Sequence, residues 1–246
     1  MNTVKIIHKD PDFLVINKPP GLPVHGGDRV RGETLVDFLV ARYPEIKTAG
    51  DDPILRPGIV HRLDKDTSGV MVVARNQKTF EALKDIFKNR LAEKIYWAVV
   101  CGLPEKREGI INYPIGRLIR NPLKRGVNIY RGSTPVDTGI EPLQIRIRGE
   151  REALTKYKVL RSGENYSLLE VVPKTGRMHQ IRVHLAAINH PVACDKIYGG
   201  KNVCCPPGTS RQLLHARSIS FSYPEGRKLH FEADPPEDFS QALMIL

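Results

Sequence analysis

The sequence predicts an α+β fold, in which a mixed and largely antiparallel central sheet is flanked by helices and loops. Segments typical of strands outnumber those typical of helices, and the two kinds do not follow a strict strand–helix–strand alternation. No internal repeat, low-complexity tract or clear linker divides the 246 residues. That length is enough for one large domain or for two lobes that share a core.

Strands are expected where β-branched and aromatic residues gather between turn-forming residues. Residues 4–8 and 13–18 form an early pair around the turn signal KDPD. The unbroken apolar run at 70–74 has the length and composition of a strand buried on both faces. Further strands are expected at residues 94–100, 143–148, 154–160, 166–172 and 215–223.

Three segments carry apolar residues at helical spacing. Residues 34–43 place Leu35, Phe38 and Leu39 on one side. The strongest signal covers residues 77–92, with Asn76 as the expected N-cap. Its apolar side chains are Phe80, Leu83, Phe87 and Leu91. The third helix is expected over residues 178–188, where the stripe consists of Met178, Ile181, Leu185 and Ile188.

The chain is strongly basic, with a formal net charge of +11. This favours an anionic partner such as nucleic acid, although a generally basic surface gives the same total. Residues 117–131 (RLIRNPLKRGVNIYR) carry five cations and no acid. A solvated face usually mixes both signs, so this segment is better explained as a surface that follows phosphates.

The N-terminal residues, the lengths of the apolar stretches and the spacing of the cysteines bear on the protein's location and on metal binding. The N-terminal residues lack the apolar region of a secretory signal, and no stretch approaches the roughly 18 apolar residues of a membrane span, so we expect a cytoplasmic protein. Cys101, Cys194, Cys204 and Cys205 lack CxxC spacing. We therefore expect reduced thiols and no metal site.

Residues 59–76 (IVHRLDKDTSGVMVVARN) join a dense ionic cluster directly to the expected buried strand. A loop fused to such a strand is held rigidly, which suits a catalytic group. Asp64 would then be a fixed carboxylate at the edge of a core. The local sequence alone favours a simpler role, in which Asp64 pairs with Arg62 or caps the turn.

Six segments resemble, in order, the motifs of the RluA family of RNA pseudouridine synthases. They are residues 17–25 (NKPPGLPVH), 61–69 (HRLDKDTSG), 93–102 (EKIYWAVVCG), 113–117 (YPIGR), 175–186 (TGRMHQIRVHLA) and 213–221 (LLHARSISF). The resemblance covers almost the whole chain. It implies one catalytic domain over residues 1–246, with two lobes around a central RNA-binding cleft. The sequence begins on the catalytic strands without the small S4-like domain of some members, so we expect the catalytic domain itself or partners to select the RNA.

The resemblance implies an isomerisation that detaches uracil from C1′ of a uridine, turns the base and rejoins it through C5. Such a reaction needs no metal and no cofactor. The resemblance assigns the essential carboxylate to Asp64, acting at the ribose as nucleophile or as base. It assigns the cation that keeps this carboxylate ionised to Arg182, which the expected helix places at the polar margin of its apolar stripe. Tyr96 would stack under the uracil near C5, although core packing beside Trp97 is the alternative.

Further residues are expected to contact RNA. Arg62 is the candidate to fill the space left when the target base is flipped out. His61 is equally well explained as a hydrogen-bonded loop histidine. The remaining expected contacts are Lys18, Arg177, His179, Arg117, Arg120, Lys124 and Arg125. Contacts of this kind with phosphates give affinity and salt dependence but no sequence choice.

The leading interpretation is therefore a monomeric synthase that acts on ribosomal or transfer RNA. A non-catalytic RNA-binding or ribosome-assembly factor on the same scaffold is the alternative. A nucleoside glycosidase is a third reading, but ordinary glycoside hydrolysis uses two carboxylates, and no second one is identified beyond the neighbouring Asp66.

Overall fold

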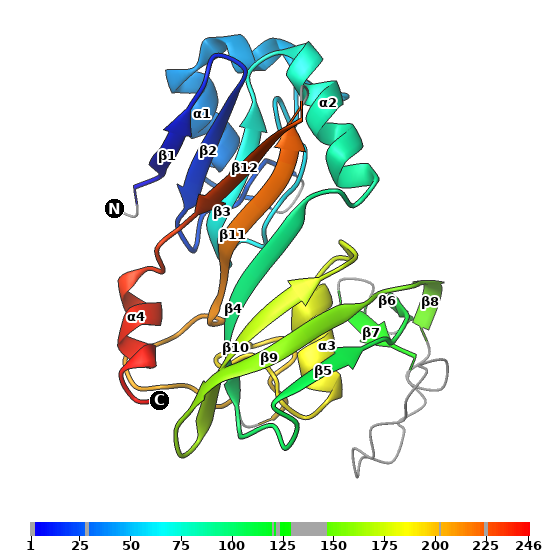
Figure 1. Cartoon of the computed structure of the whole chain (residues 1–246), viewed down its shortest axis with the longest axis vertical. Helices are drawn as coiled ribbons and strands as arrows, with labels where there is room; N and C mark the ends of the chain where they lie inside the picture. Colours follow the sequence, from blue (N-terminus) through cyan, green and yellow to red (C-terminus); the bar gives the residue numbers. More distant parts are fainter. Residues whose placement is uncertain are drawn as a thin grey trace. The chain divides into compact units, whose positions relative to one another are not determined.

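The computed structural model describes residues 3–27, 30–119, 121, 124–128, 147–201, 203–223 and 226–246. It divides the chain into two compact units, drawn in Figure 1. Unit 1 comprises Met1–Lys94 and His215–Pro236, and unit 2 comprises Ile95–Leu214 and Glu237–Leu246. The predicted α+β class is confirmed, because helices accompany sheets whose strand pairs are mostly antiparallel.

Unit 1 is built around a mixed sheet. Its strands are β1 (Lys5–Lys9), β2 (Phe13–Lys18), β3 (Ser68–Ala74), β11 (Leu214–Tyr223) and β12 (Arg227–Glu232). β2 lies between β1 and β3 and is antiparallel to both, whereas β11 runs parallel to β3 and antiparallel to β12. The helices are α1 (Leu35–Arg42), the 3₁₀ helix η1 (Pro44–Thr48) and α2 (Gln77–Lys88), which packs against β3. All seven residues of β3 are buried, as its apolar composition predicts.

Side-chain caps fix the starts of both α-helices in unit 1. The Thr34 hydroxyl accepts the Asp37 amide, and the Asp37 carboxylate accepts the Thr34 amide, which completes a capping box before α1. The predicted cap of α2 is confirmed, since the Asn76 side chain accepts the Thr79 amide at 2.9 Å.

The end of α2 differs from the prediction, because the helix stops at Lys88. Arg90 adopts the left-handed conformation, with φ at 60°. The amide of Leu91 then donates to the Ile86 carbonyl, and that of Arg90 to the Phe87 carbonyl, which closes the helix in a Schellman motif. Leu91 is consequently 66% exposed rather than part of the apolar stripe.

Unit 2 contains two sheets. The larger has the strand order β4 (Glu93–Cys101), β10 (Tyr166–Pro173), β9 (Thr155–Ser162) and β5 (Glu108–Ile111). The smaller has the order β7 (Arg125–Val127), β6 (Ile115–Leu118) and β8 (Ile147–Arg151). Helix α3 (Gln180–Ala187) packs against β7, β9 and β10 (Figure 1), and α4 (Glu237–Leu243) closes the chain. Most of the strand predicted at 143–148 lies outside the described residues.

The larger sheet of unit 2 has an apolar core on each face. Ala98 and Val100 belong to one cluster with Leu185 of α3, whereas Val99 belongs to a second cluster with Phe239 of α4. This follows from the alternation of side chains along a strand. Within the described ranges, no helix is long and apolar enough to cross a membrane.

Candidate active site

In unit 1, the loop that carries Asp64 is tied to the N-terminal motif by Lys18. This lysine is fully buried at the end of β2. Its ammonium donates to the carbonyl oxygens of Pro19 at 2.8 Å, Leu22 at 2.9 Å and Lys65 at 2.9 Å. The carbonyl of Lys65 directly follows Asp64, so Lys18 fixes the backbone beside the predicted catalytic carboxylate.

The burial of Lys18 changes its interpretation. A side chain that is 0% exposed and bound to three carbonyls is not available to RNA, so we assign Lys18 to holding the loop instead. A second bond supports the same contact, because the Gly21 amide donates to the Lys65 carbonyl at 3.0 Å. Within the loop, the Thr67 amide donates to the Asp64 carbonyl, and the Asp64 side chain is half-buried.

The end of the loop is anchored by close contact between β3 and β11. Gly69 has φ at 122°, and a Cβ there would lie 2.2 Å from the Ala216 carbonyl oxygen. Only glycine fits this position. The neighbouring Ser68 hydroxyl lies 2.9 Å from Nδ1 of the buried His215. The loop that carries Asp64 is therefore restrained at Lys65, directly beside it, and again at Ser68 and Gly69, where the loop ends.

His61 has a defined structural role. Its Nε2 accepts the Val72 amide at 2.9 Å, and its ring stacks on Phe87 with centroids 4.3 Å apart. Burial lowers the pKa of His61 to about 3, with a further contribution from the charge of Lys94, so the imidazole is neutral. This matches the hydrogen-bonded loop histidine, and an RNA contact through His61 remains a prediction.

Arg62, unlike the neighbouring His61, has an exposed side chain. One guanidinium nitrogen lies 3.3 Å from Nε2 of His25. His25 Nδ1 lies 2.7 Å from the Gly26 carbonyl and therefore carries the proton, which leaves Nε2 to accept from Arg62. The exposed position is compatible with the predicted role in base flipping, which stays a prediction.

In unit 2, Arg182 forms a buried ion pair with Asp195. Arg182 Nε and Nη2 donate to the two carboxylate oxygens at 2.7 and 2.9 Å. Asp195 is fully buried and also accepts the amides of Ile197 and Tyr198 at 2.9 and 3.1 Å. Burial alone would raise the pKa of Asp195, but the hydrogen bonds and charge of Arg182, with the two amides, lower it below its usual value.

The position of Arg182 corrects one expectation. The helix begins at Gln180 rather than Met178, and its residues from Gln180 to Leu185 are all buried. Arg182 is 4% exposed, so it lies in the interior and not at a polar margin. Its carboxylate partner within unit 2 is Asp195; the predicted pairing with Asp64 remains a prediction.

Tyr198 contacts several of the predicted site residues. Its hydroxyl accepts the Arg125 amide at 3.0 Å and lies 2.9 Å from Nδ1 of His179. Its ring lies under the guanidinium of Arg182, with 5.2 Å from Cζ to the ring centroid. The tyrosine thus links strand β7, the start of α3 and the buried ion pair. Sequence reasoning missed both Tyr198 and Asp195, since nothing in the spacing shows that an acid 13 residues beyond Arg182 returns to it.

Tyr96 and Trp97 occupy opposite faces of β4, as alternation predicts. Tyr96 is half-buried and packs against the cluster that includes Leu185 of α3. Trp97 packs against the cluster that includes Phe239 of α4. Both rings therefore contact a core, and the catalytic role of Tyr96 stays a prediction.

Three of the predicted basic contacts, Arg117, Arg125 and Arg177, line one pocket of unit 2. Lys124 is half-buried, with Nζ 3.4 Å from the Ile197 carbonyl. The seventh expected contact, Arg120, lies outside the described residues.

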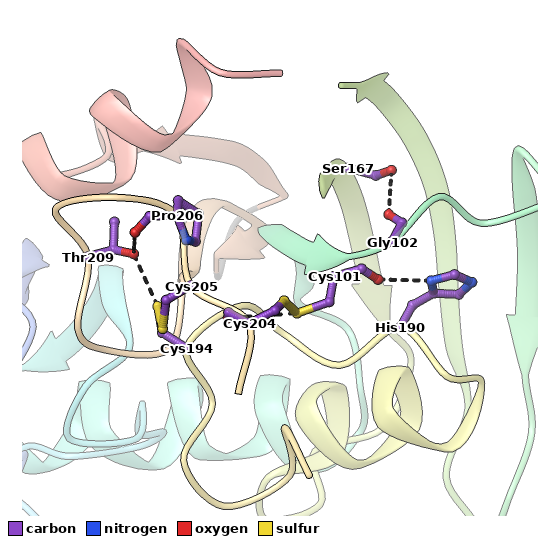
Figure 2. Close-up of a disulfide and its surroundings, with 9 residues drawn as sticks. All are labelled: Cys101, Gly102, Ser167, His190, Cys194, Cys204, Cys205, Pro206 and Thr209. Carbon is purple, nitrogen blue, oxygen red and sulfur yellow. Dashed lines mark hydrogen bonds between the residues drawn. A yellow bond between two sulfur atoms is a disulfide. The ribbon is translucent and has the colours of Figure 1, made fainter. Parts of the chain in front are cut away.

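The cysteines differ from the expectation of free thiols. Figure 2 shows two disulfides, which join Cys101 to Cys204 and Cys194 to Cys205. Folding brings the Cα atoms of these pairs to 6.2 and 4.8 Å, within the usual range for a disulfide. Sequence spacing did not show this because Cys101 and Cys204 are 103 residues apart. The Cys194–Cys205 bond closes the segment that carries Asp195.

The two units, each taken by itself, supply a carboxylate on an anchored loop, a buried arginine and a group of basic side chains, which are residue types that enzymes acting on nucleic acids use. The comparison with known proteins identifies the class of enzyme. Residues 12–187 match the family described as RNA pseudouridylate synthase, and the chain belongs to this family. The family is one of isomerases that act on RNA.

Relatives and solved structures agree along nearly the whole chain. An uncharacterised RNA pseudouridine synthase from Synechocystis is 37% identical over 245 residues, covering 98% of this chain and 68% of the relative. The ribosomal large subunit pseudouridine synthase D of Neisseria meningitidis is 36% identical over 250 residues, covering 98% of this chain and 60% of the relative. Human RNA pseudouridylate synthase domain containing 4 has a TM-score of 0.75 at 29% identity, covering 98% of this chain and 92% of that structure.

Proposed function

We propose that this chain isomerises specific uridines to pseudouridine in structured ribosomal or transfer RNA, with Asp64 as the essential carboxylate. The observation that carries the proposal is the family match over residues 12–187, which includes Asp64, Tyr96 and Arg182. The similarity to a ribosomal large subunit synthase supports ribosomal RNA as one substrate class.

In this proposal, the carboxylate of Asp64 acts at the ribose, either as a nucleophile on C1′ or as a base. The bond from C1′ to N1 breaks, and a bond from C1′ to C5 forms after the base turns. The proton lost from C5 is relocated, so no other atom enters or leaves. The two anchors of the Asp64 loop support this role, because a group that must follow a turning base needs a fixed position.

Arg182 and Tyr96 take the supporting roles. The guanidinium of Arg182 offsets the cost of keeping the Asp64 carboxylate ionised and dry, and Tyr96 stacks under the uracil near C5. Arg62 enters the space that the flipped nucleotide leaves. Asp195 holds Arg182 charged and oriented through its two hydrogen bonds.

We further propose that the protein is a monomer, that it acts in the cytoplasm, and that it uses neither a metal nor a cofactor. Sedimentation of the purified protein tests the first of these. A sedimentation coefficient that matches twice the mass of 27.7 kDa would contradict it.

The direct test is incubation of cellular RNA with purified protein, followed by chemical mapping of pseudouridine. We expect wild-type protein to convert defined uridines and Asp64→Ala to convert none. Full activity of Asp64→Ala would refute the assignment of Asp64. Tight RNA binding by the wild type without modification of any uridine would instead favour the assembly-factor alternative, and release of free uracil would favour a glycosidase.

A further inference from the structure

The smaller sheet of unit 2 forms a pocket of about 630 Å³ whose lining is strongly basic. Among the described residues, five arginines and one acid contribute to it: Arg117 from β6, Arg125 from β7, Arg148, Glu150 and Arg151 from β8, and Arg177 from the loop before α3. Arg148 and Arg151 were not among the contacts that the sequence indicated. They become neighbours of the others because β8 pairs with β6.

Among the residues that the structure describes, the lining of this pocket carries more positive than negative charge, with one carboxylate to five arginines. Arg117, Arg148 and Arg151 are exposed, and across the described ranges their side chains make no hydrogen bond or ion pair with another residue. The acid among the described lining residues, Glu150, also accepts a hydrogen bond from Asn128 at 3.0 Å, and its single charge offsets at most one of the five arginines. Gathering several like charges with few opposite ones costs free energy, so such an arrangement indicates an anionic ligand.

Two of the five arginines are held in place by the protein. Arg125 Nη1 donates to the Lys124 carbonyl at 3.2 Å, and its Nη2 lies 3.0 Å from the sulfur of Met178. Arg177 Nε donates to the Glu152 carbonyl at 3.0 Å. Held guanidinium groups lose less entropy when they bind, which favours a ligand that meets them in a fixed geometry.

Glycines keep the backbone of the pocket open. A Cβ at Gly149 or at Gly176 would have no heavy atom of the described residues within 4 Å, so both positions border open space in the described part of the unit. Gly149 also has φ at 64°, which few other residues adopt. A ligand can therefore approach the main chain of β8 and of the loop before α3.

A second hollow in the same unit provides a contrast. It measures about 460 Å³, is formed by β5, β9 and β10, and its charged lining consists of Lys156, Lys158, Glu108 and Glu170. Two cations face two acids there, which is the pattern of an ordinary solvated surface. The excess of positive charge is thus a property of the arginine pocket and not of every concave surface of unit 2.

We propose that this arginine pocket binds consecutive phosphodiester groups of the RNA substrate, with Arg148 and Arg151 of β8 as direct phosphate contacts. The planar fork of arginine matches two phosphate oxygens, and the described residues of the lining include no aromatic ring, which argues for backbone contact rather than base stacking. A volume of about 630 Å³ exceeds one phosphate and accommodates a short run of nucleotides. The proposal rests on the proposed function for its ligand.

The test compares the double variant Arg148→Gln/Arg151→Gln with the matched control Lys156→Gln/Lys158→Gln, which removes the same charge from the balanced hollow. The probe is a fluorescent RNA hairpin of about 20 nucleotides, and its Kd is measured at several salt concentrations, with circular dichroism as a check of folding. We expect about a tenfold weaker Kd for the arginine variant at moderate salt. The slope of log Kd against log salt should fall by about 1.4 to 1.8, which corresponds to two phosphate contacts in a single strand or in a duplex.

The control variant should bind the hairpin as the wild type does. Equal losses in both variants would show that general surface charge binds the RNA, and no loss in the arginine variant would show that the pocket does not, so either result overturns the proposal. Competition by inorganic phosphate at millimolar concentration that removes all arginine-dependent binding would point to a free phosphate site instead and also overturn it. Because binding is measured without turnover, a protein that binds through the pocket but forms no pseudouridine contradicts the proposed function alone.

Discussion

Replacing Asp195 with Asn tests how strongly unit 2 depends on its buried ion pair. The substitution keeps the size of the side chain but removes the charge that faces Arg182. The new amide group meets Nε or Nη2 of Arg182 donor to donor, at an arginine whose side chain is 5% exposed. Loss of one partner of a buried pair costs about 3–5 kcal/mol.

The chain offers a matched control in the pair between Arg211 and Asp238. Its geometry is nearly the same, with Nε and Nη2 donating to the two carboxylate oxygens at 2.6 and 2.8 Å. Asp238 is 29% exposed, however, whereas Asp195 is 0% exposed. Water can solvate the charge that Asp238→Asn leaves behind, so we expect a cost of about 1 kcal/mol.

Urea unfolding at pH 7 measures both costs. Trp97 is the one tryptophan of the chain and packs in a core of unit 2, so its fluorescence reports this unit. Because the pKa of Asp195 is lowered, its contribution is present above its ordinary value of 3.8 and is complete at pH 7. At an m-value of about 2 kcal/mol per M, the midpoint should fall by about 2 M for Asp195→Asn and about 0.5 M for Asp238→Asn. Equal shifts would refute the argument from burial.

Three further changes have defined outcomes. Burial lowers the pKa of His184 to about 4, although the carbonyl of Tyr113, which accepts from its Nε2, opposes this shift. The neutral form is therefore favoured in the folded state, and its stabilising contribution is complete above about pH 6.5 and is lost as the pH falls towards 4. Between pH 6.5 and pH 4, urea unfolding should show that the free energy of unfolding falls by about 3 kcal/mol less in His184→Gln than in the wild type. An equal fall in both proteins would contradict the assignment. Tyr198→Phe keeps the ring but removes the acceptor for the Arg125 amide. Steady-state kinetics should therefore show about a fivefold higher KM for RNA, with kcat within about twofold of the wild type. A fall in kcat alone would contradict this role. Thiol titration of denatured protein purified without reductant should detect no free cysteine, and reduction should lower the free energy of unfolding by about 3 kcal/mol or more; four titratable thiols before reduction would contradict the pairing.

The local features of the fold could be predicted because they depend on neighbouring residues. An unbroken apolar run is enough to predict β3, and a single asparagine before an apolar stripe is enough to predict the start of α2. The end of α2 could not be predicted in this way. Its Schellman motif has Arg90 where glycine is usual, so the sequence carried no stop signal.

The partners of charged side chains were much harder to predict. Lys18, in the motif of residues 17–25, was expected to contact RNA, but its ammonium is bound to a carbonyl 47 residues away. Arg182 likewise depends on Asp195 beyond the end of its helix. Periodicity shows which apolar residues share a face, whereas the pairing of charges depends on how distant loops meet.

The central claim is that one carboxylate, at Asp64, performs the chemistry. The most direct measurement is single-turnover formation of pseudouridine in a modified RNA, comparing Asp64→Asn with Asp66→Asn, which makes the same change two residues away. We predict that Asp64→Asn binds the RNA but forms no detectable pseudouridine, while Asp66→Asn remains active within about tenfold of the wild type. Formation of pseudouridine by Asp64→Asn at the wild-type rate would contradict the account.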